Sequence, residues 1–349
     1  MKYIHMFKKI RWGNYFLLAN KVYIQKLSKI FSYAIIVIII LLLISLYLPK
    51  AVPNNLIIEI PKGSSAQKVA RILKDNNLIY SAYFLRGVFK FSGQDIKLVP
   101  GEFQIPKKIN IAKLIVLLTN PKNLYYHKLI IVEGIRTEDA LIIIENETKL
   151  SGHITLEVTE GELLPNTYYF LKGDLRDDLL KNIKQSMNDY LDKLWQTRSP
   201  ALPYKNKQEA LILASIVEKE ASELQDRKIV AGIFLNRLNR LNMSLQADAT
   251  VEYGLRKRGK INQRLSTIPT PYNSYINKGL PPTPIANPSA DALKAVFYPY
   301  FSDFVYFVAD GKGTHVYAKT YDEHLRNVAK WRIIQKQAKI ANLATKISN

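Results

Sequence analysis

The chain lacks cysteine altogether and contains few histidines. None of its 349 residues is Cys, so disulfide bonds, thiolate zinc sites and a cysteine nucleophile are excluded, although this absence does not indicate a cellular compartment. The five histidines are scattered, and no two have the i, i+4 spacing that metal sites on helices favour. We therefore expect neither a metal site nor a cofactor.

Acidic residues are also scarce. The 29 Asp and Glu stand against 50 Lys and Arg, which gives a formal net charge of +21 at pH 7. A charge of this size and sign fits three classes of anionic partner, namely nucleic acid, an anionic membrane surface and an acidic polymer. Composition alone does not choose among them.

One segment lacks charge of either sign. Residues 30–48, IFSYAIIVIIILLLISLYL, form an uncharged run of 19 residues. A helix of that length spans roughly 28 Å, about the hydrocarbon core of a bilayer. The 29 residues before it contain seven Lys and Arg and no acid. The positive-inside rule then predicts residues 1–29 in the cytoplasm and the chain beyond Pro49 on the other side of the membrane.

Two other interpretations of this run are weaker. A cleaved signal peptide would need an unusually long basic region, and SLYLPKAVPNN offers no convincing small-x-small cleavage site. A buried core helix is disfavoured because apolar side chains cover every face. We predict a single-pass anchor, so nucleic acid is not expected as a partner, whereas lipid headgroups and cell-wall polymer are.

The sequence pattern after the anchor predicts a mixed α+β fold in three regions. Residues 55–125 have the order strand, helix, helix, strand, which indicates a small α/β module. Residues 126–204 partly repeat that pattern, and a boundary is expected at SPALPYKNKQ. Residues 205–345 begin with two successive helices, continue through a proline-rich loop and a hairpin turning at residues 310–313, and end in a basic helix.

Two glutamates near the start of the third region differ in their predicted surroundings. If QEALILASIVEKEASEL, residues 208–224, is one helix, Glu218 and Glu220 point about 200° apart. An apolar stripe then flanks Glu220, formed by Leu213, Ile216, Val217 and Leu224. Burial raises a carboxyl pKa, which suits a general acid working near neutral pH. The alternative is that Glu220 pairs with a Lys or Arg at a helix contact.

Several segments, in one order, resemble a known family. LASIVEKEA is followed by NRL, LQADATVEYG, TPYNSY, GLPPTPIANP and YFVADGKGTHVY, and EGELLPNTYYF precedes them. Together they resemble the endolytic murein transglycosylase, or YceG-like, family from the anchor to about residue 327. The resemblance implies a LysM-like module near residues 55–125, a lysozyme-like catalytic domain at residues 205–345, and Glu220, the second Glu of EKE, as the catalytic residue.

The resemblance also implies a function. The expected activity is cleavage of the MurNAc–GlcNAc β-1,4 bond within nascent peptidoglycan strands, which leaves a 1,6-anhydro-MurNAc end and terminates strand elongation. The expected location is the cell inner membrane, with the catalytic domain in the periplasm. The expected partners are peptidoglycan glycan strands and peptidoglycan synthases (penicillin-binding proteins).

One carboxylate suffices for such a reaction, although glycosidases commonly need two. The acid protonates the glycosidic oxygen and then, as a carboxylate, removes the proton from the C6 hydroxyl of the same sugar. That hydroxyl attacks C1 within one molecule, so no activated water is required. The lack of an obvious second carboxylate in the sequence fits this scheme.

Further candidate residues lie in the shared motifs. Those with a candidate role in substrate binding are Tyr272, Asn273, Tyr275, Gln246, Glu160 and His315. The three residues of the YNSY motif offer hydrogen bonds and stacking faces to sugars, or else they order the proline-rich loop. Gln246, together with Asp248 and Thr250, lines the cleft or fixes a turn, and we favour the turn. The resemblance puts His315 near the cleft rim, and Glu160 is expected in the same groove.

Three positions depart from the family pattern. Ala249 stands where the family usually has Pro, and Thr283 and Ser289 stand where it usually has Gly. We expect all three in loops, where they alter the local backbone shape. The chemistry of the site does not depend on them.

Two alternatives stay open at the level of the sequence. A non-catalytic cell-wall-binding or scaffold protein of the wall-synthesis machinery could use the same domains. The LysM-like module could contact glycan or serve only as a spacer from the membrane. Cleavage of isolated wall glycan would distinguish an enzyme from a scaffold.

Overall fold

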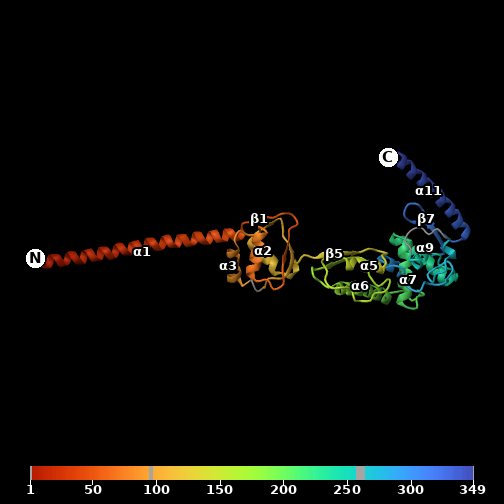
Figure 1. Cartoon of the computed structure of the whole chain (residues 1–349), viewed down its shortest axis with the longest axis horizontal. Helices are drawn as coiled ribbons and strands as arrows, with labels where there is room; N and C mark the ends of the chain where they lie inside the picture. Colours follow the sequence, from red (N-terminus) through yellow and green to blue (C-terminus); the bar gives the residue numbers. More distant parts are fainter. Residues whose placement is uncertain (1, 94–96, 257–263, 349) are drawn as a thin grey trace. The chain divides into compact units, whose positions relative to one another are not determined.

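The chain folds into two compact units in a computed structural model that describes residues 2–93, 97–256 and 264–348 (Figure 1). The first unit extends to Tyr126 and the second begins at His127. Side chains of residues 1–22, which make up most of the predicted basic segment, lie outside the described part of the chain.

The first unit begins with a long helix, α1 (Lys2–Tyr47). Its stretch Gln25–Tyr47 is long and apolar enough to cross a membrane, and among the described residues it is the one helix with this property. None of that stretch is buried inside the protein. A helix that is apolar on every face is stable in hydrocarbon or in a protein core, so the structure is compatible with the anchor predicted at residues 30–48.

The rest of the first unit is a small module of short strands and helices. In chain order its elements are β1 (Lys50–Ala51), β2 (Ile57–Ile60), α2 (Ala66–Asp75), α3 (Ala82–Ser92), β3 (Gly101–Gln104), β4 (Lys108–Ile109), α4 (Ile111–Thr119) and the 3₁₀ turn η2 (Pro121–Asn123). β2 pairs with β3 and β1 with β4, both antiparallel. The expected order strand, helix, helix, strand is confirmed, whereas the likeness to a LysM domain stays a prediction.

Serine caps explain where the first two helices of the module begin. The hydroxyls of Ser65 and Ser81 accept hydrogen bonds from the backbone N–H three residues later, at 3.3 and 3.2 Å. Each bond satisfies one of the N–H groups that a helix start leaves without a partner. The helices then bury one apolar face each in a core that includes Leu73, Leu85 and Phe103.

The end of α1 is attached to this module. Leu46 packs against the module core, and Asn110 Nδ2 donates a hydrogen bond to the carbonyl of Tyr47 at 3.3 Å. Only Leu48 and Pro49 separate α1 from β1. Part of the segment between α1 and β2 is therefore strand, and α1 enters the module without a flexible connection.

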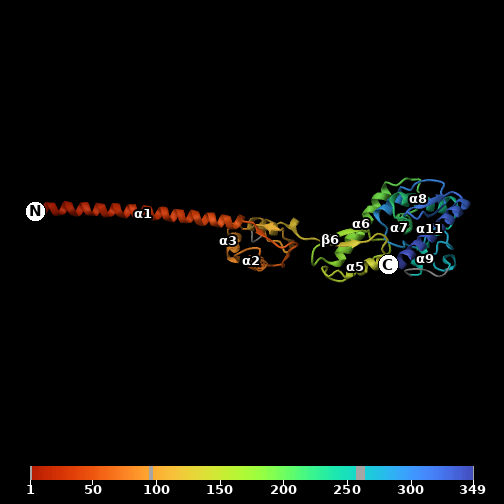
Figure 2. The same cartoon turned by 90° about the horizontal axis from the view of Figure 1, so that it is seen from above.

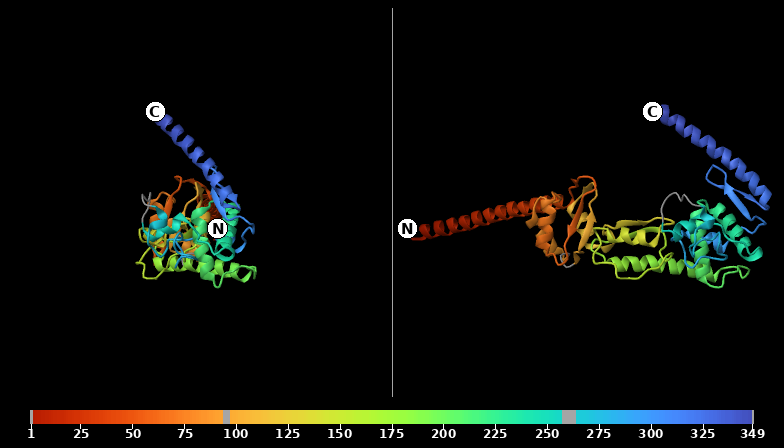
Figure 3. Two further views of the ribbon diagram at one scale, coloured as in Figure 1. Left: turned by 90° about the vertical axis from the view of Figure 1, so that its right-hand side faces the viewer. Right: turned by 45° about the vertical axis from the view of Figure 1, so that its right-hand side comes forward.

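The second unit has more helix than strand. Its elements are β5 (His127–Ile131), α5 (Thr137–Glu145), β6 (Asn166–Phe170), α6 (Arg176–Gln196), α7 (Lys207–Glu220), α8 (Leu224–Leu235), the π-helix η3 (Asn236–Arg240), α9 (Asp248–Gly254), the 3₁₀ turn η4 (Leu265–Thr267), α10 (Ala290–Phe297), β7 (Tyr306–Ala309), β8 (His315–Ala318) and α11 (Tyr321–Ser348). β5 pairs with β6 and β7 with β8, both antiparallel. The hairpin β7–β8 is as predicted and lies beside α11 (Figure 3). The mixed α+β class is confirmed.

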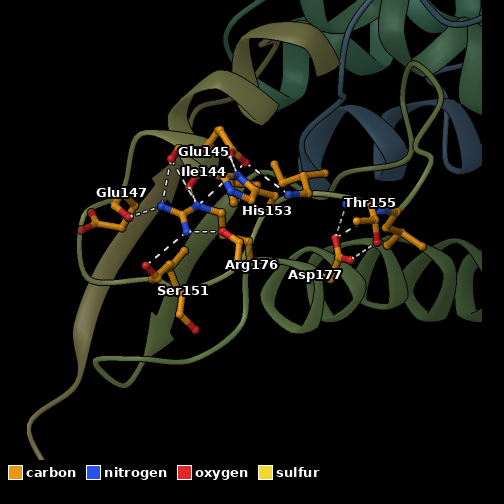
Figure 4. Close-up of polar contacts among 12 residues, drawn as sticks. Ile144, Glu145, Glu147, Ser151, His153, Thr155, Arg176 and Asp177 are labelled. Carbon is orange, nitrogen blue, oxygen red and sulfur yellow. Dashed lines mark hydrogen bonds and ion pairs between the residues drawn. The ribbon is translucent and has the colours of Figure 1, made fainter.

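The first residues of α6 organise the loop that follows α5 (Figure 4). The guanidinium of Arg176 donates hydrogen bonds to the carbonyls of Ile144, Glu145, Glu147, Leu150 and Gly152. The last carbonyls of a helix have no partner within it, and the several N–H groups of one Arg can satisfy them together. Asp177 accepts a hydrogen bond from the backbone N–H of Thr155 at 2.9 Å, so the loop is held at two points.

Helix α6 joins two hydrophobic cores. Its first half contributes Leu180 and Ile183 to a core shared with β5, α5 and β6. Its second half contributes Met187 and Leu191 to a core shared with α7, α8 and α10. The boundary predicted near residue 204 therefore falls between α6 and α7, inside one compact unit.

Asn287 connects the proline-rich loop to the region before α6. Its side chain is fully buried, and its Oδ1 accepts a hydrogen bond from the N–H of Leu163 at 2.8 Å. Its Nδ2 donates to the carbonyl of Ile135 and to Oγ1 of Thr137, both at 3.0 Å. One amide thus fixes three distant segments of the chain.

Replacing Asn287 with alanine should destabilise the second unit strongly. The substitution leaves the buried N–H of Leu163 without its partner, which costs about 1–3 kcal/mol, and removes the two hydrogen bonds that Nδ2 donates. We expect urea denaturation to show a loss of roughly 2 kcal/mol or more in the free energy of unfolding. Asn239→Ala is the matched control, because Asn239 is exposed and bonds only within its own helix. Equal effects of the two substitutions would contradict the proposed role of Asn287.

Candidate active site

Glu220 is the last residue of α7. Ala221 adopts an extended backbone, with φ −140° and ψ 143°, so the helix stops there, and α8 begins only at Leu224. The prediction of one helix over residues 208–224 is wrong at this point, and Leu224 belongs to the next helix. The apolar run 210–217 is buried on every face. α7 is therefore a core helix whose C-terminal end emerges into a pocket.

Glu220 lines a pocket of about 260 Å³. Its lining residues are Glu220, Arg237, Gln246, Asp248, Tyr275, Tyr306, Phe307, Tyr321 and His324. They come from α7, η3, α9, β7, α11 and two loops, so only the folded chain assembles them. The assumption of one helix over residues 208–224 predicted an apolar stripe around Glu220. The pocket lining is instead mostly polar and aromatic.

The carboxyl of Glu220 has an unusual proton affinity. Burial, together with the negative charge of nearby Asp248, raises the pKa of Glu220 to about 7. His315, Arg237 and a hydrogen bond from the N–H of Ala249 act in the opposite direction and are outweighed. A carboxyl with a pKa near neutrality can both give up and accept a proton at physiological pH. Its environment thus suits acid–base work.

Asp248, at the start of α9, is a second carboxylate in the same pocket. The hydroxyl of Tyr275 donates a hydrogen bond to its Oδ1 at 2.5 Å. Burial, followed by this bond to Asp248, raises the pKa of Tyr275, which keeps the phenol protonated as the donor. No second carboxylate was obvious in the sequence, and the structure adds one to the pocket lining. The preferred assignment of Asp248 to a turn missed its place in the pocket.

Arg237 provides a fixed positive charge beside Glu220. Its Nε donates to the carbonyl of Val305 at 2.8 Å, and its guanidinium lies 5.7 Å from the ring centroids of both Tyr306 and Phe307. Burial lowers the pKa of Arg237 to about 10, so the group stays protonated at neutral pH. Contacts of a guanidinium with ring faces are favourable and also restrict its position.

His324 has a ring nitrogen without a partner. Its Nδ1 is buried and makes no hydrogen bond within the part of the chain that the structure describes. The ring stacks on Tyr306 with centroids 5.2 Å apart. Burial and the nearby charge of Arg237 lower the pKa of His324, which favours a neutral imidazole. A buried polar atom without a partner is rare in folded proteins, and here it belongs to a residue of the pocket lining.

The predicted residues Gln246 and Tyr275 line the pocket with Glu220. Gln246 has a positive φ of 55°, and its N–H donates to the carbonyl of Ser274 at 3.0 Å. A non-glycine residue in this region of backbone space is uncommon and is often found at functional sites. Gln246 thus takes part in both the cleft and the turn that the sequence offered as alternatives.

Two predicted residues of the proline-rich loop do not line the pocket. Asn273 is fully buried, its Nδ2 donates to two loop carbonyls at 2.8 and 2.7 Å, and its Oδ1 accepts from the N–H of Tyr275 at 2.9 Å. The ring of Tyr272 packs edge-on against Tyr253, with centroids 4.9 Å apart. Both residues therefore order the proline-rich loop, which was the second of the two alternatives for the YNSY motif. Asn273 also holds Tyr275 at the pocket.

Glu160 and His315 also lie outside the pocket lining. Glu160 accepts hydrogen bonds from the N–H of Thr137 at 2.9 Å and from its hydroxyl at 3.0 Å, and so caps the start of α5. The prediction that it faces the same groove as Glu220 is not supported by these contacts. His315 Nδ1 lies 2.7 Å from Asp226 Oδ2. His315 acts on Glu220 through its charge only.

Glu218 has a structural environment. Its Oε1 accepts a hydrogen bond from Arg227 Nη2 at 2.8 Å, and its Oε2 accepts from the N–H and the hydroxyl of Ser289 at 2.9 and 2.6 Å. Both members of the ion pair are almost fully buried. The ion-pair alternative considered for Glu220 therefore describes Glu218 instead.

The three departures from the family pattern have clear structural settings. Ala249 lies in the first turn of α9 rather than in a loop, and proline is also tolerated at helix starts. Thr283 Oγ1 lies 2.9 Å from the hydroxyl of Tyr272. Ser289 caps α10 and donates to Glu218. The two residues that replace glycine thus make hydrogen bonds that glycine could not make.

The sequence reasoning missed several pocket residues: Arg237, Tyr306, Phe307, Tyr321 and His324. The shared segment NRL contains the arginine and YFVADGKGTHVY contains two of the aromatic residues, so these segments held a usable signal. No cluster of His, Asp and Glu that could hold a metal ion occurs among the described residues.

Comparison with known proteins adds an independent line of observation. The sequence model of the YceG-like family matches residues 58–330. A protein of Bacillus subtilis (strain 168) named endolytic murein transglycosylase is 31% identical over 312 residues, which cover 79% of this chain and 84% of that protein. A protein of the same name from Streptococcus pneumoniae serotype 2 is 38% identical over 181 residues, covering 49% of this chain and 32% of that protein. A solved yceG-like protein from Listeria monocytogenes is 26% identical, with a TM-score of 0.48, over 78% of this chain and 98% of that chain.

Glu220→Gln should stabilise the folded chain at alkaline pH. The carboxyl has its ordinary pKa of 4.5 when unfolded and about 7 when folded, so its ionisation opposes folding. The penalty is absent below about pH 4.5, grows as the pH rises towards 7, and reaches roughly 3 kcal/mol above that. Urea denaturation at pH 4, 6 and 8 should show the advantage of the variant increasing with pH. An advantage that does not change with pH would contradict a buried, protonated carboxyl.

Proposed function

The chain belongs to the YceG-like family, and from this premise we propose that it is a membrane-anchored endolytic lytic transglycosylase that cleaves peptidoglycan glycan strands. Two relatives that carry the name endolytic murein transglycosylase support the activity. The observation that carries the proposal is Glu220, a carboxyl with a pKa of about 7 in a polar pocket. We assign the catalytic role to this residue.

Glu220 acts first as an acid and then as a base. Its proton goes to the oxygen of the MurNAc–GlcNAc β-1,4 bond, the bond from C1 to that oxygen breaks, and positive charge develops at C1. The resulting carboxylate accepts the proton of the C6 hydroxyl on the same sugar, whose oxygen bonds to C1. The products are a 1,6-anhydro-MurNAc end and a free GlcNAc hydroxyl, and no water is consumed. A carboxyl whose pKa lies near the working pH can perform both steps.

Asp248 supports this chemistry by its charge. Its carboxylate raises the pKa of Glu220, so Glu220 holds its proton until the substrate arrives, and the same charge favours the positive C1 of the transition state. The hydrogen bond from Tyr275 engages one oxygen of Asp248.

The basic and aromatic residues of the pocket complete the site. Arg237 offers a positive charge to the carboxylate that Glu220 becomes between the two steps. Gln246 and Tyr275 offer polar contacts to sugar hydroxyls, and the ring of His324 lines the same pocket. The aromatic walls formed by Tyr306 and Phe307 suit the apolar faces of sugar rings.

The location proposed for the enzyme follows from its first helix. The apolar stretch Gln25–Tyr47 supports a single membrane span, and the positive-inside rule favours an N-terminus in the cytoplasm with the chain beyond Pro49 on the outer side. In a cell with two membranes this places the enzyme on the inner membrane and in the periplasm. There it would meet nascent strands and the penicillin-binding proteins that make them, and its cuts would terminate elongation. A LysM-like module and a lysozyme-like catalytic domain are parts of the same proposal.

Glu220→Gln should abolish release of 1,6-anhydro products. A glutamine cannot donate a proton, and loss of a general acid typically lowers the rate roughly 10²–10⁴-fold. Mass analysis of products from purified glycan incubated with the full chain in detergent or lipid measures the effect. Glu223→Gln, at an exposed position of the same charge, is the matched control and should retain activity.

The same experiment distinguishes the competing functions. Products with reducing ends in place of anhydro ends would indicate a hydrolase. Binding of glycan without any cleavage by the wild-type chain would indicate a non-catalytic wall-binding protein. Turnover by Glu220→Gln at the wild-type rate would remove Glu220 from the mechanism.

Asp248→Asn should move the pH dependence of the reaction to lower pH. Glu220 must be protonated to start the reaction, so kcat/KM should fall as the pH rises through about 7, the pKa of that carboxyl. Removing the negative charge of Asp248 lowers the pKa of Glu220, and the alkaline limb of the profile shifts with it. Tyr275→Phe keeps the charge and is the matched control, for which the limb should shift less. An unchanged limb in Asp248→Asn would contradict the charge coupling.

A further inference from the structure

Helix α3 has two apolar faces, of which only one is used inside the protein. Leu85 and Phe89 are fully buried in the module core. On the other side Tyr83 is 82% exposed and Phe91 is 94% exposed. Large exposed aromatic side chains that share one helix face form an apolar surface that needs an explanation.

That second face borders a groove next to the end of α1. The groove has a volume of about 500 Å³ and is lined by Leu42, Leu46, Tyr83, Phe84, Gly87, Val88, Phe91 and Ser92. Two of these residues belong to the apolar stretch Gln25–Tyr47. Figure 2 also shows α3 on the side of the module where α1 joins it. The groove is therefore continuous with the predicted membrane span.

The position of the groove relative to the end of the predicted span can be measured along α1. Leu42 precedes the end of the span, Tyr47, by five residues, which is about 7.5 Å of helix. Helices that lie in a membrane interface bury their apolar face roughly 5–10 Å into the boundary between headgroups and acyl chains. If the span lies in a bilayer, α3 lies at this depth.

The module cannot easily move away from that level. Leu46 packs against its core, and Asn110 bonds to the carbonyl of Tyr47. Only two residues connect α1 with β1. Because these contacts fix the module to the end of the span, an inserted span brings α3 to the lipid surface.

Positive charge accompanies the aromatic face. Arg86 and Lys90 of α3 are exposed, and Lys50 Nζ lies 4.3 Å from the ring centroid of Tyr80. Residues 50–126 contain twelve Lys and Arg but four Asp and Glu. Tyrosine at the headgroup level and lysine or arginine beside phosphates are typical of surfaces that contact membranes.

We propose that α3 is an interfacial helix that inserts Tyr83 and Phe91 into the outer leaflet, with lipid acyl chains filling the groove between α3 and α1. Arg86 and Lys90 then meet lipid phosphates. The module lies flat on the bilayer and is not a free spacer. This inference rests on the proposed membrane anchoring, and it assigns the bilayer lipid itself as the partner of this surface.

The absence of cysteine allows a direct test on the full chain. Tyr83→Cys and Phe91→Cys, each labelled with an environment-sensitive nitrobenzoxadiazole dye, are reconstituted in liposomes containing anionic lipid. Spin-labelled lipids with the quencher near the headgroup should reduce the fluorescence at both positions roughly twofold or more relative to a solvent-exposed site. The emission should also shift to shorter wavelength.

Lys122→Cys is the matched control on the same module. Lys122 is exposed in η2, and α4 carries the chain to it from Asn110 beside α1, about 14 Å away at the helical rise. Its dye should behave as in water. Ile38→Cys, in the middle of the span, reports whether α1 is inserted, in matched liposomes whose spin label sits near the end of the acyl chain.

The four labelled positions separate the outcomes. Quenching at Ile38→Cys, Tyr83→Cys and Phe91→Cys, but not at Lys122→Cys, supports the inference. Quenching at Ile38→Cys alone overturns the interfacial helix and leaves the anchor intact. No quenching at Ile38→Cys overturns the anchor itself, and the interfacial helix with it.

Discussion

The partial burial of one carboxyl group beside a second carboxylate is the constraint on which the site depends. Glu220 ends a helix whose run 210–217 is buried on every side, so the position of its side chain is set by a rigid core. The C-terminal end of a helix carries partial negative charge, which disfavours a carboxylate there. Burial and the charge of Asp248 act in the same direction and raise the pKa of Glu220 to about 7. The proton that the proposed reaction needs is held by this combination.

The two glutamates of EKE divide the structural and chemical tasks between them. Glu218 forms a buried ion pair with Arg227 and accepts two hydrogen bonds from Ser289, which ties the end of α7 to α8 and to the start of α10. A buried ion pair is tolerable only when its remaining hydrogen-bonding groups are satisfied, and here they are. Glu220 makes no ion pair with any described residue. Its pKa is therefore set by burial and by the charges of nearby residues.

The two units face different surroundings. In the second unit, two cores joined by α6 bury the apolar side chains and leave a polar pocket at the end of α7. In the first unit, α1 and one face of α3 leave large apolar side chains exposed. Protein that leaves such surface uncovered needs another apolar phase. In the proposed location a lipid bilayer would satisfy this need for both helices.

The sequence by itself determined features that depend on local pattern. The uncharged run 30–48, the order of strands and helices in residues 55–125 and the hairpin near residues 310–313 could be predicted because composition, periodicity and turns act over a few residues. Glu220 could be chosen from its motif. Tertiary structure alone decided which residues surround it, because Arg237, Asp248 and His324 come from separate segments. It also ended α7 at Glu220, gave Glu160 and Asn273 structural roles, and revealed the second carboxylate, since burial and charge proximity are properties of the folded chain.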